Sequence, residues 1–529
     1  MSDLSVFDSV CILGRHRELK PGGPHTADDL LGAMDRHGIA EALVLDCLSR
    51  ENHPADGNER VLSAAAVSPR LHPAWALLPT GEYEGLPRPR QLVRRMRDAG
   101  VGAAFLFSGQ YKISLADWAV DELLEPLAEH RVPLFINPND LADPRGWDAM
   151  DWDAVVSLCC RHPDLPVIAS EWRIRRAQRM IYRALDACPN LRIELSGYWL
   201  YRGIEFITER WGARRLVFGS NWPTFGQAMT LAPLACADIS ESDKGLIAGG
   251  NLRKLLSWHE LDSAEPKPPS AVDRYVEFGR TGKRPAEMRF ADCHGHLGGR
   301  MAHYHVPGGD LDSTVVEMER LGVDVCCVFS IAGVLSDESF GNDIVADAVR
   351  RYPDRFVGFA LLNPHRGRDG MLAELERCEK LGLRGIKLIA HYQGHSDEGD
   401  WLDVPCEWAH DRGWIILNHH WGSPAQVERL VSGYPSACFI TGHATAAYAD
   451  TMRRHPNLFV CSCPLLAPRD CEDLVRVIGA DRLLFGSDLQ DLPIAWGLGP
   501  ILFSYLREGD KDLILGDNLR GILKKYSIA

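Results

Sequence analysis

The residues with the clearest chemical potential lie in the second half of the chain, where histidines and a carboxylate accompany short apolar runs. His294 and His296 alternate along one such run, so that both side chains face the same side of a predicted strand. His443 and Asp488 each end a later run. Neutral imidazoles with one carboxylate suit a borderline divalent cation, whereas Mg²⁺ or Ca²⁺ would favour oxygen ligands alone. The residue types therefore predict a metal site, with Zn²⁺ as the preferred ion.

Two adjacent histidines end the fifth apolar run of this half, and one of them is expected to join the metal site. Counting forward from Gly413 favours His419, while counting back from Gly422 favours His420. We take His419 as the predicted ligand and keep His420 as a metal or substrate residue in reserve.

Lys387 lies in the fourth run, and its ammonium group allows two interpretations. It could take part in catalysis or metal binding, or it could form a plain ion pair with Asp488. Asp488 itself could instead cap the segment that follows it. Neither alternative is removed by the sequence, but both are less economical than one shared polar site.

These residues need elements that bring them together, and the second half supplies a regular series. Short runs of apolar and β-branched residues alternate with amphipathic helical stretches, which is the pattern of a (β/α)8 barrel with strands buried on both faces. The polar residues all fall at predicted carboxyl ends of strands, the face where barrel enzymes place their chemistry. The strand candidates are RFADCHGHL, VDVCCVFSI, FVGFALLNP, RGIKLIA, WIILNHH, CFITGHA, NLFVCSCP and RLLFGSD.

The first half repeats the same series, which indicates an internal duplication. GARRLVFGSN at residues 212–221 answers GADRLLFGSD at 479–488, and KGLIAGGNLRKLL at 244–256 answers KDLILGDNLRGIL at 511–523. The predicted fold is therefore α/β, with two tandem (β/α)8 TIM-like barrels. A stretch rich in proline and small residues separates them, as expected of a linker. We predict a first barrel over residues 1–262, a linker over 263–287 and a second barrel over 288–529.

The second half resembles the amidohydrolase superfamily in its amidohydrolase-related branch, also called amidohydrolase 2. The resemblance is carried by His-x-His on the first strand, GIKLIAHYQG at the fourth, the fifth-strand histidines, TGHA at the sixth and FGSD at the eighth. It implies a divalent metal, one ion with two still open, in a barrel that activates water. The roles that it implies are metal ligation by His294, His296 and His419, a ligand or general-base role for Asp488, a second-metal or substrate-polarising role for His443, and for Lys387 the place of a lysine that some members carry in carboxylated form.

The first half lacks this set at every corresponding position. Aliphatic and aromatic side chains cannot coordinate a cation, and an asparagine cannot accept a proton at neutral pH. The first barrel is therefore predicted to be a pseudoenzyme domain that packs against the second barrel in place of a dimer partner. The replacements are Val10 for His294, Ile12 for His296, Phe105 for Lys387, Asn137 for His419, Glu171 for His443 and Asn221 for Asp488.

Composition narrows the functional classes. The 529 residues carry a net charge of -14, which argues against a nucleic-acid partner, and no apolar run is long enough to span a membrane. The beginning of the sequence lacks the pattern of a secretory signal, and the fifteen cysteines lack disulfide or zinc-finger spacing. We expect a cytoplasmic protein with reduced thiols and a small-molecule substrate, and homo-oligomerisation stays open.

The predicted function is a metal-dependent hydrolase of a small amide, lactone or related carbonyl compound. The first alternative is a metal-dependent decarboxylase of an aromatic or enol acid. Decarboxylating relatives often carry His-Pro at the end of the fifth strand, where this chain has NHHWG. A non-catalytic scaffold is the second alternative. Weak candidates for binding a substrate carboxylate are the loop residues Arg300, His305, Tyr392 and Arg469.

Overall fold

The structure is a computed structural model that describes residues 4–141, 150–258, 272–302 and 304–526. The chain divides into two compact units, one formed by residues 1–282 with 466–468 and the other by residues 283–465 with 469–529. Residues 259–271, which hold the first part of the predicted linker, lie outside the described residues. The remainder of that predicted linker contains helix α12 (Arg274–Thr281), which packs on α9 (Ala228–Cys236) within the first unit.

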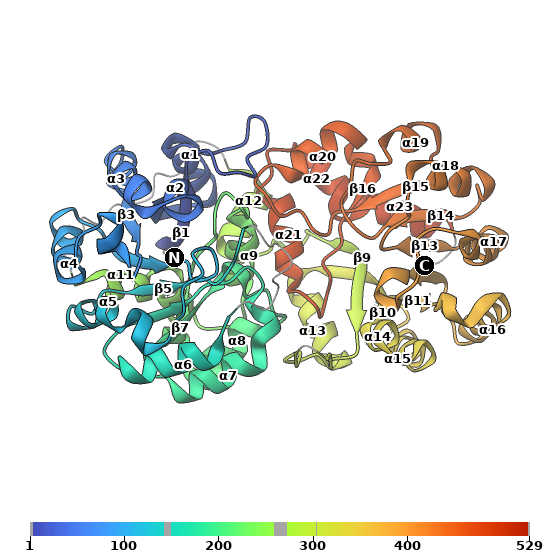
Figure 1. Cartoon of the computed structure of the whole chain (residues 1–529). Coiled ribbons are helices and arrows are strands. Elements are labelled where there is room, and N and C mark those ends of the chain that lie inside the picture. The colour runs from blue at the N-terminus through green and yellow to red at the C-terminus, as the bar shows by residue number, and fades with distance from the viewer. Residues whose placement is uncertain (1–3, 142–149, 259–271, 303, 527–529) are drawn as a thin grey trace. The chain divides into compact units, whose positions relative to one another are not determined.

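Each unit is built on a sheet of eight parallel strands in sequential order, so the prediction of two (β/α)8 barrels is confirmed. Figure 1 shows the helices of each unit arranged around its strands. The strands of the first unit are β1 (Val6–Leu13), β2 (Ile39–Asp46), β3 (Leu71–Ala76), β4 (Ala103–Leu106), β5 (Leu134–Ile136), β6 (Val167–Ala169), β7 (Leu191–Glu194) and β8 (Leu216–Val217). Those of the second are β9 (Phe290–Leu297), β10 (Val323–Ser330), β11 (Phe356–Leu361), β12 (Gly385–Leu388), β13 (Ile415–Asn418), β14 (Cys438–Thr441), β15 (Leu458–Cys461) and β16 (Leu483–Leu484).

Helices fill the connections between consecutive strands and complete the outer layer of each barrel. The remaining helices of the first unit are α1 (Ala27–His37), α2 (Cys47–Glu51), α3 (Pro54–Ala65), α4 (Pro89–Asp98), α5 (Asp117–Glu129), α6 (Trp152–Arg161), α7 (Gln178–Ala187), α8 (Gly203–Trp211), α10 (Glu241–Gly245) and α11 (Asn251–Leu256). Those of the second are α13 (Leu311–Leu321), α14 (Ile331–Leu335), α15 (Glu338–Arg351), α16 (Gly367–Lys380), α17 (Asp403–Arg412), α18 (Pro424–Gly433), α19 (Ala449–Arg454), α20 (Asp470–Ile478), α21 (Ile494–Leu502), α22 (Glu508–Asp512) and α23 (Asn518–Lys525).

The first helix after each opening strand is delimited by the same local signals. Helix α1 begins after Thr26, whose hydroxyl accepts from the backbone N–H of Asp29, and ends at Gly38 with φ of +72°. Its counterpart α13 begins after Asp310, whose carboxylate accepts from a backbone N–H of the first turn, and ends at Gly322 with φ of +80°. Side-chain acceptors satisfy the free N–H groups at a helix start, and glycine adopts the left-handed conformation at its end without a steric penalty.

Each barrel closes through a buried aspartate on its first strand. In the first barrel the backbone N–H of Ser220 donates to Asp8 Oδ1 at 2.8 Å and its hydroxyl donates to Asp8 Oδ2 at 2.5 Å. In the second, Ser487 donates from the same two groups to Asp292. We call each of these pairs the closing contact. A parallel bridge between the first strand and the segment after the last strand accompanies it in both barrels.

The interior of the first barrel is apolar at the positions that correspond to His294, His296 and Lys387 of the second barrel. Val10 and Ile12 on β1 belong to a buried cluster with Phe105 and Phe135. The rings of Phe105 and Phe135 stack with centroids 4.4 Å apart and planes 6° from parallel. Burial of aromatic and branched side chains of this kind is the main stabilising contribution to a barrel core.

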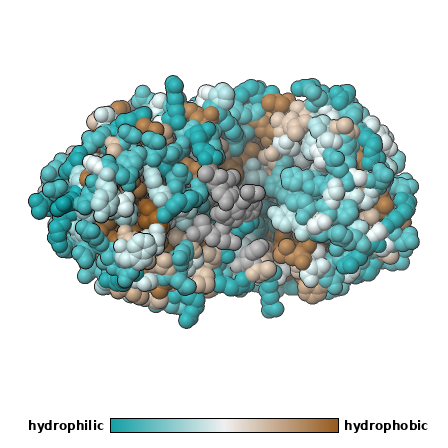
Figure 2. All heavy atoms as spheres, in the orientation of Figure 1, coloured by the Kyte–Doolittle hydropathy of each residue, from teal (hydrophilic) through white to brown (hydrophobic). Residues whose placement is uncertain are grey.

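The surface in Figure 2 is mostly hydrophilic and the cysteines are free, as the composition and the cysteine spacing indicate. On the face drawn in Figure 2, hydrophilic side chains cover most of the surface of both units and apolar residues form small separate groups. Within the described ranges, no helix combines the length and apolar character needed to cross a membrane. All fifteen cysteines are free, and all except Cys160 are buried.

Candidate metal centre

Strand β9 presents two histidines to the barrel interior. His294 and His296 are both buried, with exposed fractions of 2% and 5%. Gly295 between them allows β10 to approach closely, because a Cβ atom at this position would lie 2.6 Å from Cys326 Sγ. A larger residue between the two histidines would clash with β10, so the strand needs a glycine at this position.

Asp488 joins these histidines from the opposite end of the sequence. Its Oδ1 lies 2.7 Å from His296 Nε2 and 3.5 Å from His294 Nε2. The residue adopts φ of +61°, which aspartate tolerates, and its N–H donates to the carbonyl of His294 at 2.9 Å. Burial alone would raise the pKa of Asp488, but the charge of His294 and the hydrogen bond from His296 hold this pKa well below its usual range.

Lys387 lies fully buried next to this group. Its Nζ is 3.3 Å from His294 Nε2 and 4.2 Å from the ring centroid of Phe329. Burial lowers the pKa of Lys387 to about 7, although the charge of Asp488 acts in the opposite direction. In the part of the chain that is described, its ammonium group forms no ion pair with Asp488, so the interpretation as a plain ion pair has no geometric support.

The fifth and sixth strands bring a second pair of imidazoles together. His419 directly follows β13, His443 follows β14 by two residues, and the two Nε2 atoms are in contact. Burial lowers the pKa of His443 to about 4, although the charge of Asp488 opposes the shift. Burial also lowers the pKa of His419, and the neighbouring His443 adds to the effect. Both rings are therefore neutral in this arrangement, which is the form that binds a metal.

His420 and His391 complete a more exposed group around His419. The ligand atoms of these three histidines lie within 4.8 Å of one another, as do those of the His294, His296 and Asp488 group. His420 and His391 are exposed, whereas His419 is half-buried. Burial, followed by the charge of His391, lowers the pKa of His420. The rings of both adjacent histidines lie near that of His443, with centroids 3.9 Å away for His419 and 5.8 Å away for His420. His419 is therefore the closer of the two.

Of the four weak candidates for substrate binding, Tyr392 lies beside the histidines of the site. Tyr392 is 53% exposed, and its ring lies 5.4 Å from that of His419, so the fold brings it to the histidines. Arg300 and His305 are exposed and form an isolated backbone bridge with each other. Arg469 is exposed in the left-handed conformation directly before α20.

Several residues of the site were missed by the sequence reasoning. Cys461 Sγ lies 3.7 Å from His294 Nδ1, and Cys463 Sγ lies 3.4 Å from Asp488 Oδ2. The ring of Phe329 lies 4.4 Å from that of His296. The sequence indicates only reduced thiols for these two cysteines, although their spacing of two residues at the end of a strand is a signal that both side chains lie on the face of the histidines.

The residues present fit a divalent cation. Three donor atoms from His294, His296 and Asp488 converge in a buried place, and His296 Nδ1 has no hydrogen-bond partner in the described residues. Two neutral imidazoles that face each other through Nε2, as His419 and His443 do, need a shared proton or cation between them. Nitrogen donors with one carboxylate suit transition metals better than alkaline-earth ions.

A family model described as Amidohydrolase matches residues 26–258 and again residues 333–518, which is more than half of the chain. The chain belongs to the amidohydrolase family. Each barrel of this amidohydrolase contains one of the matched regions, and the second region includes Lys387, His419, His443 and Asp488. The match to the first region shows that the amidohydrolase pattern persists in a barrel whose predicted ligand positions hold other residues.

The chain is also similar to solved structures. An uncharacterized TIM-barrel protein from Bordetella bronchiseptica is 16% identical over 45% of this chain and 100% of its own, with a TM-score of 0.37. A 2,6-dihydroxybenzoate decarboxylase from Rhizobium is 17% identical over 45% and 99%, with a TM-score of 0.37. A 5-carboxyvanillate decarboxylase from Novosphingobium aromaticivorans, solved with bound manganese, is 14% identical over 45% and 98%, with a TM-score of 0.37. No curated protein matches the chain.

Proposed function

We propose that the second barrel is a metal-dependent hydrolase of a small amide, lactone or related carbonyl compound. The observation that carries the proposal is the convergence of Asp488 Oδ1 with His296 Nε2 at 2.7 Å and His294 Nε2 at 3.5 Å, at the carboxyl ends of the strands. Residues from β9 and from the segment after β16 meet there, although 192 positions separate His296 from Asp488 in the sequence. Such a meeting of ionisable groups at this face is typical of barrel active sites.

His294, His296, His419 and Asp488 are the residues that would hold the ion, with zinc as our preferred metal. When bound, a divalent cation supplies Lewis-acid polarisation of a substrate oxygen and makes water more acidic. His391 and His420 lie beside His419, and their arrangement supports a second ion as an extension of the same proposal.

Each of the surrounding side chains has a separate role in the proposed reaction. The Asp488 carboxylate accepts a proton from the attacking water and returns it to the leaving group. His443, which follows β14 and whose Nε2 contacts that of His419, polarises the substrate carbonyl or holds a second ion. Lys387 Nζ, 3.3 Å from His294 Nε2, holds that imidazole in place from beneath the site. Phe329 packs against both His296 and Lys387 and keeps water away from that side.

The same reasoning assigns no metal chemistry to the first barrel. Val10, Ile12 and Phe105 occupy the places of His294, His296 and Lys387, and they are packed in an apolar cluster. We propose that this barrel is a pseudoenzyme domain and that the substrate is a small molecule handled by the second barrel alone.

Elemental analysis of the full chain tests the proposal, together with hydrolysis of a panel of amides and lactones. We expect about one or two metal equivalents per chain, lost in the His294→Ala/His296→Ala variant. The control His410→Ala/His455→Ala removes two histidines from the opposite end of the same barrel and should keep the metal. Wild-type protein without metal after purification in metal-supplemented buffer would overturn the proposal. Release of CO₂ from aromatic acids, with no hydrolysis, would replace it with a decarboxylase.

A further inference from the structure

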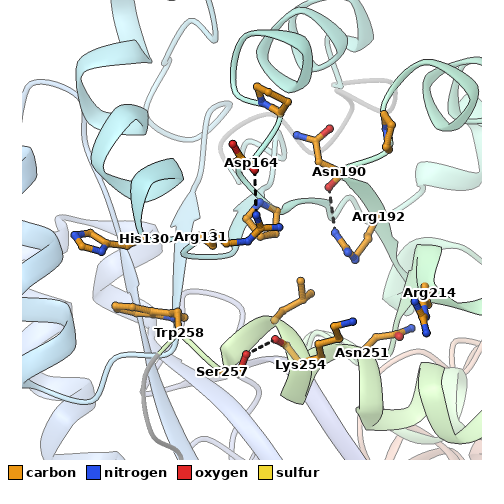
Figure 3. A pocket seen from close by; sticks show the side chains of 14 residues that line it. His130, Arg131, Asp164, Asn190, Arg192, Arg214, Asn251, Lys254, Ser257 and Trp258 are labelled. Carbon is orange, nitrogen blue, oxygen red and sulfur yellow. Dashed lines mark hydrogen bonds and ion pairs between the residues drawn. The ribbon is translucent and has the colours of Figure 1, made fainter.

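The first barrel contains a cavity of about 570 Å³ at the amino-terminal ends of its strands. The polar set of the second barrel lies at the carboxyl ends of that barrel's strands. The residues around it precede or begin strands. Arg131 lies before β5, Asn190 and Arg192 lie at the start of β7, and Arg214 lies before β8. Figure 3 shows Arg131, Arg192 and Lys254 around the same open space. A volume of this size is typical of a small-molecule site.

The lining of the cavity is strongly cationic, although the chain as a whole carries a charge of -14. Arg131, Arg192, Arg214 and Lys254 contribute four positive charges, and Asp164 contributes one negative charge. Asp164 is already paired with Arg131, with 3.0 Å between Oδ1 and Nη1. Three cations therefore remain without a carboxylate from the lining.

These three cations have few partners. Arg192 donates from Nη1 to the carbonyl of Asn190 at 3.2 Å, and this is the one hydrogen bond described for its guanidinium group. Burial lowers the pKa of Arg192 to about 10, and the charges of Arg215 and Arg131 act in the same direction. In the described residues, Arg214 and Lys254 have no ion-pair or side-chain hydrogen-bond partner. A partly buried guanidinium among like charges is costly unless an anion joins it.

The cationic set belongs to the first barrel alone. Ile193 pairs with Leu216 in the first barrel, and Val460 pairs with Leu483 in the second. The residue before Ile193, Arg192, therefore corresponds to Phe459. The repeated segments place the remaining positions in the same way. The counterparts of Arg131, Arg192, Arg214 and Lys254 are Gly413, Phe459, Asp481 and Gly521. Not one of the four counterparts is cationic, so the charge of this cavity is not an inheritance from a common barrel.

One side of the cavity is apolar, which gives it room for more than a bare ion. Leu255, Trp258 and three prolines contribute to the lining. The indole of Trp258 is held in place, because its Nε1 donates to the carbonyl of Gly102 at 2.8 Å and the guanidinium of Arg97 lies 5.9 Å from its ring centroid. A fixed aromatic face beside several cations suits a ligand with both a ring and an anionic group.

We propose that this cavity is a binding site for an organic phosphate of about nucleotide size, distinct from the metal centre of the second barrel. The phosphate lies between Arg192, Arg214 and Lys254, and the organic part lies against Leu255 and Trp258. Guanidinium groups donate paired hydrogen bonds to phosphate oxygens, which makes arginine the usual residue for such recognition.

Isothermal titration of the full chain with adenosine monophosphate, with adenosine and with citrate tests this site. We expect adenosine monophosphate to bind and to bind more weakly at high salt, with adenosine and citrate showing no saturable heat. Arg214→Asp and Lys254→Gln, both at exposed positions, should each weaken binding roughly tenfold or more. The control Arg183→Gln removes an exposed arginine of the same barrel and should bind as wild type does.

The outcomes separate the parts of the proposal. No saturable binding of adenosine monophosphate at low salt overturns it, as do unchanged affinities in both variants. Equal binding of adenosine shows that the cations play no part. Binding of citrate without adenosine monophosphate overturns the assignment to phosphate. None of these readings depends on metal content or on turnover, so a failure here is distinct from a failure of the proposed hydrolase.

Discussion

Where each barrel closes, the two halves of the chain make the same contacts, but the groups beside those contacts differ. Asp8 accepts from Ser220 in the first barrel as Asp292 accepts from Ser487 in the second. The residue after each serine is Asn221 or Asp488, and both adopt a positive φ, of +55° and +61°. The closing contact is retained in both barrels, whereas the residue after the serine is a carboxylate in the second barrel and an amide in the first.

The two interiors show how a barrel can lose a polar centre without losing its structure. The inward position on the fourth strand holds Lys387 in the second barrel and Phe105 in the first. Phe105 stacks on Phe135 and fills the space, whereas Lys387 is buried against Phe329 and His294. The comparison teaches that an apolar side chain can take the place of the buried lysine, because strands of a closed barrel need only a filled interior.

The largest expected effect is a loss of turnover when the residue after the closing serine is changed in the second barrel but not in the first. Asp488→Asn should retain much of the bound metal and lower turnover by about 100-fold or more, because an amide cannot accept the proton. Asn221→Asp is the matched control in the first barrel. Both residue types tolerate the left-handed backbone, so neither change strains the chain. Turnover and metal content are the measurements, and a wild-type rate in Asp488→Asn would contradict the assignment of the base.

The second effect concerns the inward position of the fourth strand. Phe105→Lys should destabilise the first barrel by about 3–5 kcal/mol, because it places a charge in an apolar cluster with no partner. Lys387→Met should leave the stability of the second barrel unchanged or raise it, while abolishing turnover. Native-state hydrogen exchange of β4 and β12 measures each barrel separately. Equal losses of protection in the two variants would contradict the prediction that Phe105 is needed for stability and Lys387 is not.

The third effect is the pH dependence that Glu194 gives to the first barrel. Burial raises the pKa of Glu194 to about 7, although hydrogen bonds from Ser196 and Ser170 oppose the shift and the charge of Asp8 adds to it. The folded state therefore holds a proton that the unfolded state has lost, and stability falls as pH rises from about 4.5 to about 7.

Glu194→Gln should remove this dependence and stabilise the first barrel by about 3 kcal/mol above pH 7. Hydrogen exchange of β7 at pH 5 and pH 8 is the measurement, with the exposed Glu59→Gln as control. The second barrel has Cys461 at the corresponding position, and burial raises the pKa of its Asp292 to about 7. The exchange of β15 should therefore keep its own pH dependence in the Glu194→Gln variant. A variant with the pH profile of wild type would contradict the assignment to Glu194.

The smallest expected effect should be equal in the two barrels. Ser220→Ala and Ser487→Ala each remove a hydroxyl that donates to a buried aspartate, at a cost of about 1–3 kcal/mol. Protection of β1 and β9 amides should fall by similar amounts. Ser487→Ala should also lower turnover, because the altered segment positions Asp488, whereas Ser220→Ala should not. Unequal losses of protection would show that the two closing contacts are not equivalent.

Much of the fold could be predicted because both barrels are built from apolar runs of strand length, repeated in the same order. The limits of elements were less accessible. Strand β16 ends at Leu484, four residues before Asp488, because the chain turns there to bond with β9. Helix α12 was missed within a predicted linker, although Asp273 and Gly282 are ordinary helix-end residues and its Tyr275 and Phe278 are buried. Neighbouring prolines made the whole stretch resemble a connection.

The sequence by itself determined the kinds of residue at the strand ends and their order, since a period of two and a repeated series place side chains on the inner face of a barrel. Tertiary structure alone decided which of them meet. Closure of the second barrel brings Asp488 to His296, and it adds Cys461, Cys463 and Phe329, whose apolar or weakly polar side chains give no signal of their own. It also gathered the cations of the first barrel around one cavity, because they come from separate strand starts and one helix. Proximity between distant segments is set by the closed sheet, and no local pattern encodes it.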